Sequence, residues 1–337
     1  MTVTIKDVAD RAGVSKTTVS HVLNKTRFVA EETRKKVELA AEYLNYEPSS
    51  VARSLKVKAT KSLGMIITSN MNPFFAEIVR EIEKFSYQGG YNLILCNTEN
   101  DPHKTKSYMQ MLSQKRVDGI LVMCSTFNDH LFTTIIKQKT VPLVVMDWGP
   151  SVDFIDQIQD NSLQGGMLAT QHLISLGHSQ IGHIAGPLNK LQSQRRFEGF
   201  QQAMTQAGLT VNPKWVVESD FECEGGYQAM EKILAQETLP TAIFVGNDIM
   251  AMGALSAINE KGLRVPQDIS LVGYDNISLS AFFSPALTTV GQPFTKLAKL
   301  AIDTLIDRLE HPREHGKTIS LEPTLVERAS TREIVEN

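Results

Sequence analysis

The chain has 337 residues, of which 42% are hydrophobic and 21% are charged. This length and mix predict a globular protein of two or three domains rather than a disordered chain. The N-terminus has no apolar signal core and no run of eighteen apolar residues occurs, so we expect neither export nor a membrane span, and a cytoplasmic location.

The formal charge is divided unevenly along the chain. Residues 1–61 contain 12 Lys or Arg and 7 Asp or Glu, a net charge of +5, and the remaining residues carry −8. A small basic segment on an acidic remainder is typical of a nucleic-acid-binding domain joined to a module with another task. On charge alone, a chance fluctuation over a short segment explains the pattern equally well. The choice between the two explanations therefore depends on the sequence motifs.

The first 47 residues carry the pattern of three short helices. Residues 4–7 have the form of a capping box, and Gly13 is placed to end the first helix. Ser15 can cap a second helix over residues 16–23, and apolar residues at helical spacing predict a third over residues 31–44. A helix, a turn with glycine and a second helix make a helix-turn-helix, which places one helix in the major groove of DNA.

The second predicted helix exposes short or hydrogen-bonding side chains near its N-terminal end. That end reaches the base edges in such domains. We therefore predict DNA contacts from Lys16, Thr17, Thr18, His21 and Arg27. The alternative is a three-helix domain with an ordinary polar surface, and the agreement of caps, turn glycine and exposed polar set favours DNA binding.

Four stretches carry a specific resemblance to a known family. TIKDVA (residues 4–9), AGVS (12–15) and TVSHVLN (18–24) are similar to the opening of the lac repressor (LacI) family, and PSSVARSLK (48–56) resembles its hinge helix. The match continues through the whole chain. It implies a helix-turn-helix domain at 1–47, a hinge helix and linker at 48–61, and a ligand-binding and dimerisation domain at 62–337.

The hinge segment is too short to form a stable helix alone. Pro48 favours a helix start, but residues 51–56 make fewer than two turns. We expect the segment to become helical only when two copies pack together on DNA; a tether without fixed structure is the alternative. The resemblance implies an apolar wedge between base steps of the minor groove at Leu55, and DNA contacts in this segment from Ser50, Ala52, Leu55 and Lys56.

Beyond residue 61, apolar runs alternate with helical patterns. Apolar strands separated by helices indicate parallel sheets covered on both faces. Two sets are predicted: residues 63–68, 92–96, 119–122 and 142–146, and residues 181–185, 242–245 and 269–274. The resemblance implies a periplasmic-binding-protein-like α/β body of two doubly wound parallel-sheet subdomains, at about 62–160 plus 292–322 and about 161–291 plus 323–337.

The positions just after these strands carry two kinds of side chain. Ligands of open parallel sheets bind beyond the carboxyl ends of the strands. Planar polar groups there can bind adjacent hydroxyls, and aromatic rings can cover a sugar ring. The resemblance to ribose-binding proteins implies polar contacts from Asn72, Asp147, Arg196, Asn247, Asp275 and Gln292. It implies aromatic contacts from Phe74, Phe75, Phe221 and Trp148, although exported ribose binders have Arg at the last position.

Two kinds of LacI-family regulator resemble different stretches of the chain. Residues 95–99, 158–163 and 220–222 look like ribose operon repressors, whereas 27–34, 115–119, 145–149 and 248–255 look like the purine repressor. The second group covers the DNA-binding part, core and scaffold, while Asn72 and Asn247 lie in the expected pocket and favour a polyhydroxylated ligand. We therefore expect ribose as the effector, with a purine base as the next alternative and another sugar as the third.

These elements predict a homodimeric repressor on a palindromic operator. The effector closes the cleft, shifts one subdomain against the other and changes the spacing of the hinge segments; a coupling of about 1–3 kcal/mol is typical. Ribose would release the operator, whereas a purine base would act as co-repressor.

Two other classes of protein fit the sequence less well. A transport protein of the same fold would have an export signal and would lack a basic N-terminal domain, and the sequence matches neither expectation. An enzyme needs a phosphate loop, a dinucleotide fingerprint or a nucleophile with a base, and the sequence contains none of these motifs. We expect no catalysis, no cofactor and no metal site, and we expect Cys96, Cys124 and Cys223 to be buried free thiols.

Overall fold

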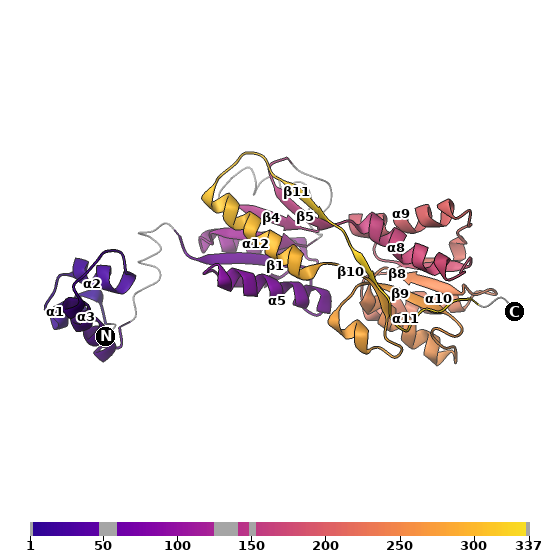
Figure 1. Cartoon of the computed structure of the whole chain (residues 1–337), viewed down its shortest axis with the longest axis horizontal. Helices are drawn as coiled ribbons and strands as arrows, with labels where there is room; N and C mark the ends of the chain where they lie inside the picture. Colours follow the sequence, from indigo (N-terminus) through magenta and orange to yellow (C-terminus); the bar gives the residue numbers. More distant parts are fainter. Residues whose placement is uncertain (1–2, 47–58, 125–140, 148–152, 335–337) are drawn as a thin grey trace. The chain divides into compact units, whose positions relative to one another are not determined.

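The computed structural model describes residues 3–46, 59–124, 141–147 and 153–334, in two compact units, Met1–Thr60 and Lys61–Asn337 (Figure 1). Five predicted site residues lie outside the described residues: Ser50, Ala52, Leu55, Lys56 and Trp148. The hinge helix is therefore carried forward as a sequence-based prediction.

Three helices form the first unit: α1 (Ile5–Ala12), α2 (Lys16–Asn24) and α3 (Glu31–Tyr43). The predicted capping box is present, because the Asp7 carboxylate accepts hydrogen bonds from the backbone N and the Oγ1 of Thr4, at 2.8 and 2.7 Å. Gly13 has a φ of 68°, the left-handed geometry that ends α1. Ser15 Oγ then accepts from the backbone N of Thr18 at 3.1 Å and starts α2. These caps build the turn of the helix-turn-helix.

A small apolar core holds the three helices together. It consists of Val8, Ala9, Val19, Val22, Val37, Ala40 and Ala41. The helix ends differ from the prediction by one residue each. α2 includes Asn24, whose Nδ2 donates to the Ser20 carbonyl at 2.9 Å, and α3 ends at Tyr43 because Leu44 is its C-cap.

The second unit contains two six-stranded sheets. The first has the order β11-β5-β4-β3-β1-β2, with all of these neighbours parallel. Its strands are β1 (Ser62–Ile67), β2 (Asn92–Asn97), β3 (Gly119–Met123), β4 (Leu143–Met146), β5 (Asp156–Asp160) and β11 (Thr318–Leu321). α5 (Pro73–Gln88) and α12 (Phe294–Glu310) cover one face, and α6 (Pro102–Gln114) packs on the other.

The second sheet has the order β12-β10-β9-β8-β6-β7, in which β12 is antiparallel to β10 and the other neighbours are parallel. Its strands are β6 (Ile181–Ala185), β7 (Val216–Glu218), β8 (Ala242–Val245), β9 (Ser270–Asp275), β10 (Thr288–Gly291) and β12 (Thr324–Val326). Helices cover both faces: α8 (Ser162–Ser175) and α9 (Leu191–Gln206) on one, α10 (Cys223–Leu234) and α11 (Asp248–Glu260) on the other. The short helices η1 (Pro213–Trp215) and η2 (Ser278–Phe282) lie in connections. The predicted fold class is confirmed.

β5 was not among the predicted strands, because its sequence DQIQD has no apolar run. Its Asp156 is nevertheless fully buried. The carboxylate accepts from Arg308 Nη1 at 2.7 Å, from Arg313 Nη2 at 2.9 Å and from the backbone N of Lys317 at 2.8 Å. A charge that is paired and hydrogen-bonded in this way can occupy a strand interior, and an apolar pattern cannot detect it.

The chain passes between the two sheets three times, after β5, after β10 and after β11. The first and third crossovers touch each other: the backbone N of Asn161 donates to the Leu321 carbonyl at 2.8 Å, and Asn161 Nδ2 lies 3.1 Å from Glu322 Oε1. We propose that the two subdomains divide at these crossovers, as the sequence suggests.

None of the three cysteines is part of a disulfide. Cys96 and Cys124 are buried as expected, whereas Cys223 is partly exposed. Within the residues described above, no group of three His, Cys, Asp or Glu side chains could hold a metal ion. None of the helices placed by the structure is both long and apolar enough to cross a bilayer.

Candidate functional site

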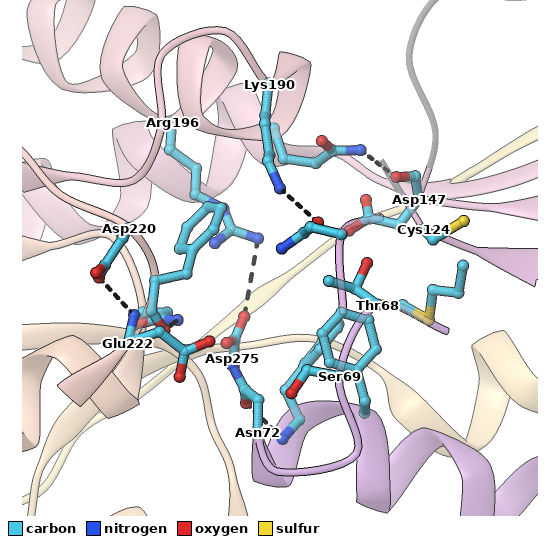
Figure 2. A pocket seen from close by; sticks show the side chains of 17 residues that line it. Thr68, Ser69, Asn72, Cys124, Asp147, Lys190, Arg196, Asp220, Glu222 and Asp275 are labelled. Carbon is cyan, nitrogen blue, oxygen red and sulfur yellow. Dashed lines mark hydrogen bonds and ion pairs between the residues drawn. The ribbon is translucent and has the colours of Figure 1, made fainter. Parts of the chain in front are cut away.

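A cavity of about 90 Å³ lies where the carboxyl ends of strands from both sheets meet (Figure 2). It is lined by most of the predicted ligand contacts: Asn72, Phe74, Phe75, Asp147, Arg196, Phe221, Asn247 and Asp275. The structure therefore brings these residues together from segments as far apart as α5 and β9. Gln292 does not line the cavity; it lies behind Asp275, to whose Oδ1 its Nε2 donates a hydrogen bond of 2.9 Å.

Four lining residues have left-handed backbone geometry; one of them is Asn100 in the loop after β2, with a φ of 60°. Asp147 follows β4 with a φ of 51°, Phe221 lies just after β7 with a φ of 73°, and Asp275 ends β9 with a φ of 103°. Non-glycine residues in this region cost of order 1–3 kcal/mol and cluster at ligand-binding sites. The strand ends are thus held in a geometry that turns these side chains toward the cavity.

Arg196 occupies the centre of the polar wall. It is 5% exposed on α9, and its Nη1 donates to the Gly246 carbonyl at 2.7 Å. Its guanidinium lies 3.7 Å from the ring centroid of Tyr274, and its Nη2 lies 3.7 Å from Asp275 Oδ1. Among the described residues, Arg196 Nε is buried without a hydrogen-bond partner. A guanidinium fixed in this way at the cavity wall is suited to a planar polar ligand.

The carboxyl groups of this wall hold their protons more tightly than ordinary aspartates. Burial raises the pKa of Asp275 to about 7, although Arg196 and the hydrogen bond from Gln292 oppose the rise. Burial and then the charge of Asp160 raise the pKa of Asp147 well above its usual value. Near neutral pH these groups can donate as well as accept hydrogen bonds, which fits an uncharged ligand.

The two predicted asparagine contacts already serve as helix caps. Asn72 Oδ1 accepts from the backbone N of Phe74 at 3.0 Å, and Asn247 Oδ1 accepts from the backbone N of Met250 at 2.8 Å. Asn247 Nδ2 also donates to the Phe221 carbonyl at 3.1 Å. These bonds fix both side chains at the cavity wall, and their contact with a ligand stays a prediction.

The aromatic residues differ in how much of the ring faces the cavity. Phe74 is 7% exposed and belongs largely to the core of the first sheet, edge-on to Phe75 with 5.1 Å between ring centroids. Phe75 and Phe221 are only partly buried. Gly186 makes room for Phe221, because a Cβ at that position would lie 2.2 Å from its ring. Phe75 and Phe221 are therefore the rings placed to cover a ligand.

Several lining residues are not among the predicted ligand contacts. They are Thr68, Ser69, Asn100, Met123, Cys124, Lys190, Gln192, Asp220 and Glu222. Lys190 Nζ donates to Asn100 Oδ1 at 3.3 Å, and Gln192 Nε2 donates to the Asp147 carbonyl. Burial lowers the pKa of Lys190. Lys190 follows β6 at the same carboxyl edge as the predicted residues, and that position was the signal that could have found it.

The predicted DNA contacts of the first unit lie on α2 and the following loop. Lys16, Thr17 and Arg27 are exposed. The Oγ1 of Thr18 lies 2.9 Å from Ser15 Oγ, and His21 Nδ1 lies 2.8 Å from Thr26 Oγ1. The structure thus presents three of the five side chains freely and fixes two by local hydrogen bonds; their contact with DNA stays a prediction.

A helix-turn-helix unit, joined to a two-sheet body with a polar and aromatic cleft, defines a DNA-binding regulator controlled by a small molecule. Known proteins bear this out. The model of "Bacterial regulatory proteins, lacI family" matches residues 4–49, and that of "Periplasmic binding protein-like domain" matches residues 170–331. The chain belongs to the LacI family, and it is a DNA-binding transcriptional repressor, not an enzyme.

Similar proteins cover nearly the whole chain. The HTH-type transcriptional repressor PurR of Pasteurella multocida is 55% identical over 329 residues, 98% of each chain. That of Proteus mirabilis is 54% identical, over 97% of this chain and 96% of its own. Among solved structures, the lac repressor dimer bound to operator and the anti-inducer ONPF matches with a TM-score of 0.90 at 33% identity, covering 98% of this chain and all of that one.

A ribose-bound LacI family regulator from Enterococcus faecalis also matches. Its TM-score is 0.74 at 31% identity, and the match covers 81% of this chain and 100% of that one. The PurR proteins share more of this sequence, so the relatives do not support the expectation of a ribose repressor.

Proposed function

We propose that this repressor is of the purine type and that a purine base, bound in the cleft, acts as its co-repressor. The carrying observation is the 55% identity, over 98% of the chain, with a repressor named PurR. A purine base, which the sequence suggests as the alternative to ribose, thus replaces ribose as the proposed effector.

The cleft geometry supports a flat, uncharged, polar ligand. Phe75 and Phe221 present partly exposed rings that can stack on a base. The guanidinium of Arg196, which lines the cavity, can donate to the acceptor edge of a base, where O6 and N7 lie side by side. Asp147 and Asp275 have raised pKa values, that of Asp275 being about 7, so each can take up a proton near neutral pH and can donate or accept at the remaining edge.

Ribose acting as an inducer is the second candidate. The specific observation in its favour is that two LacI family regulators with bound ribose, from Enterococcus faecium and Enterococcus faecalis, share this fold at 29% and 31% identity. Asp147, Arg196 and Asp275 could bind adjacent hydroxyls as well as a base edge. The two candidates predict opposite effects on operator binding.

On the DNA side, we propose that a homodimer places two copies of α2 on a palindromic operator. The proposed base-edge and phosphate contacts of the helix-turn-helix are Lys16, Thr17, Thr18, His21 and Arg27. The proposed minor-groove contacts of the hinge are Ser50, Ala52, Leu55 and Lys56.

Calorimetric titration of the full chain with hypoxanthine and, separately, with ribose tests the choice of effector. We expect saturable one-site binding of hypoxanthine and no heat from ribose at the same concentrations. Binding of ribose without hypoxanthine would replace the proposal by the second candidate. Binding of neither compound would contradict both.

A further inference from the structure

Two consecutive residues of β9 contact two of the crossovers between the sheets. The hydroxyl of Tyr274 donates a hydrogen bond of 2.5 Å to Oδ2 of Asp160, the last residue of β5 before the chain crosses to α8. Asp275 accepts from Gln292, which follows β10 at the second crossover. β9 belongs to the second sheet and β5 to the first. The Tyr274–Asp160 bond therefore fastens one sheet to the segment through which the chain leaves the other.

The position of the Tyr274 hydroxyl is tightly fixed. Tyr274 is fully buried, and a Cβ at Gly165 would lie only 2.3 Å from its hydroxyl oxygen. Asp160 is 6% exposed, and its Oδ1 accepts a second hydrogen bond from Ser162 Oγ at 2.8 Å. A hydrogen bond from a phenol to a carboxylate in such a site is strong, because the charged acceptor has little water to compete for it.

Both ends of this bond are next to residues that line the cavity. On one side, the Arg196 guanidinium stacks on the Tyr274 ring at 3.7 Å. On the other side, the backbone N of Asp147 donates to the carbonyl of Ile158, two residues before Asp160, at 2.8 Å, and the charge of Asp160 contributes to the raised pKa of Asp147. Figure 2 shows Arg196 and Asp147 on opposite sides of the cavity. A molecule that contacts both therefore acts on both partners of the buried bond.

We propose that the Tyr274–Asp160 hydrogen bond is a positioning pair that transmits occupancy of the cleft to the β5–α8 crossover. A ligand that engages Arg196 and Asp147 moves or holds the two partners, and the crossover moves with Asp160. The third crossover follows, because Asn161 donates its backbone N to the Leu321 carbonyl. The inference rests on effector control of the repressor and not on which compound is the effector.

The central test removes one oxygen atom. Tyr274→Phe keeps the ring beneath Arg196 and deletes the bond to Asp160. Tyr227→Phe is the matched control, because it deletes a hydroxyl that donates to Glu260 at 2.8 Å on the exposed side of α10 and α11. The readout is the coupling factor, which is the ratio of the operator Kd without hypoxanthine to the operator Kd with saturating hypoxanthine. A parallel series uses ribose in place of hypoxanthine.

We expect the Kd of Tyr274→Phe for the active compound to stay within about threefold of the wild-type Kd. Its coupling factor should be at least about fivefold smaller than that of wild type, a change within the range typical of allosteric proteins. Tyr227→Phe keeps the wild-type factor. A wild-type coupling factor in Tyr274→Phe would overturn the proposal.

A measurement without ligand tests the proposal even if neither compound is the effector. Hydrogen exchange of peptides containing Asn161 and Gln164 should become at least about threefold faster in Tyr274→Phe and stay unchanged in Tyr227→Phe. Unchanged exchange at the crossover overturns the proposal.

Two variants of the acceptor side guard against a folding defect in Tyr274→Phe. Asp160→Ala should reproduce the loss of coupling, and Ser162→Ala, which removes the other hydrogen bond of Asp160, should not. In the Asp160→Ala background, Tyr274→Phe should cause no further loss, as expected for two residues that act through one bond. Full additivity of the two losses would overturn the proposal.

Discussion

Lys190 Nζ donates a hydrogen bond of 3.3 Å to Asn100 Oδ1, and this bond joins the loop after β6 of the second sheet to the loop after β2 of the first. The Gln192 side chain makes a second bond of the same kind, to the Asp147 carbonyl. These bonds tie residues 190–192, after β6 of the second sheet, to lining segments after β2 and β4 of the first, so they resist opening of the cleft.

Replacing the ammonium of Lys190 should therefore speed the release of a bound effector. Lys190→Met keeps most of the stem, and loss of one exposed hydrogen bond worth about 1–1.4 kcal/mol corresponds to a roughly 5- to 10-fold faster off-rate. Stopped-flow displacement measures the rate. Lys104→Met is the control, because Lys104 pairs with Glu99 at the surface. An off-rate equal to wild type would show that the contact does not close the cleft.

Arg196 should dominate binding of the effector. Arg196→Ala removes a buried cation and leaves Asp275 without its partner, so effector affinity should fall by at least about tenfold. The neighbouring Arg195 forms a half-exposed surface pair with Glu198, and Arg195→Ala should leave affinity unchanged. Calorimetric titration of both variants measures the difference. Equal effector affinities of Arg196→Ala and Arg195→Ala would show that Arg196 does not bind the effector.

Gly186 should be intolerant of a side chain because of Phe221. In Gly186→Ala the new Cβ would lie 2.2 Å from the Phe221 ring, so the ring must move and the cavity must change shape. We expect effector affinity to fall at least about tenfold and unfolding free energy to fall by about 1–3 kcal/mol. Gly89→Ala is the control, since its Cβ would come no closer than 3.2 Å to the end of the Ile306 side chain and 3.4 Å to the Ser86 carbonyl. Calorimetry and urea unfolding report the two quantities, and wild-type affinity in Gly186→Ala would contradict the prediction.

The raised pKa of Asp275 predicts a specific dependence of stability on pH. The pKa rises from 3.8 to about 7 on folding, so the folded chain keeps a proton that the unfolded chain loses in this interval. The stabilising contribution is complete below about pH 4 and is lost as the pH rises through 7. Relative to Asp275→Asn, the wild type should therefore become progressively less stable from pH 4.5 to 7.5.

The matched control for this pH series is Asp268→Asn. Hydrogen bonds from Arg264 lower the pKa of Asp268, so its contribution changes only below the usual range of an aspartate. The stability difference between this variant and wild type should stay constant from pH 4.5 to 7.5. Urea unfolding at each pH supplies both curves. A constant difference for Asp275→Asn as well would mean that Asp275 is ionised in the folded protein at all these pH values.

The helix-turn-helix and both sheets could be predicted because their signals are local. The caps at Thr4 and Ser15 and the glycine at residue 13 define the helix-turn-helix, and apolar runs marked seven of the twelve described strands. The short strands β7, β10, β11 and β12 were not predicted, because none of them has an apolar run of four residues. β5 escaped because its buried Asp156 is neutralised by Arg308 and Arg313, which lie about 150 residues further along the chain. A one-dimensional pattern carries no information about such a distant partner.

The site could be predicted in part for a similar reason. The rule that ligands bind at the carboxyl ends of parallel strands located Asp147 and Asp275. It did not show that Gln292 lies behind Asp275, nor that Lys190 reaches Asn100, because both facts depend on how the two sheets approach each other. The effector expected from pocket residues also differed from the one favoured by whole-chain relatives, since ribose and a base need similar polar groups.

The most direct test of the account is the affinity of the full chain for a palindromic operator, selected from random DNA, with and without hypoxanthine. Fluorescence anisotropy at fixed salt gives both values. We predict that hypoxanthine tightens operator binding by about 5- to 150-fold and that ribose leaves it unchanged. Operator affinity that stays the same in the presence of either compound would contradict the claim that occupancy of this cleft controls the repressor.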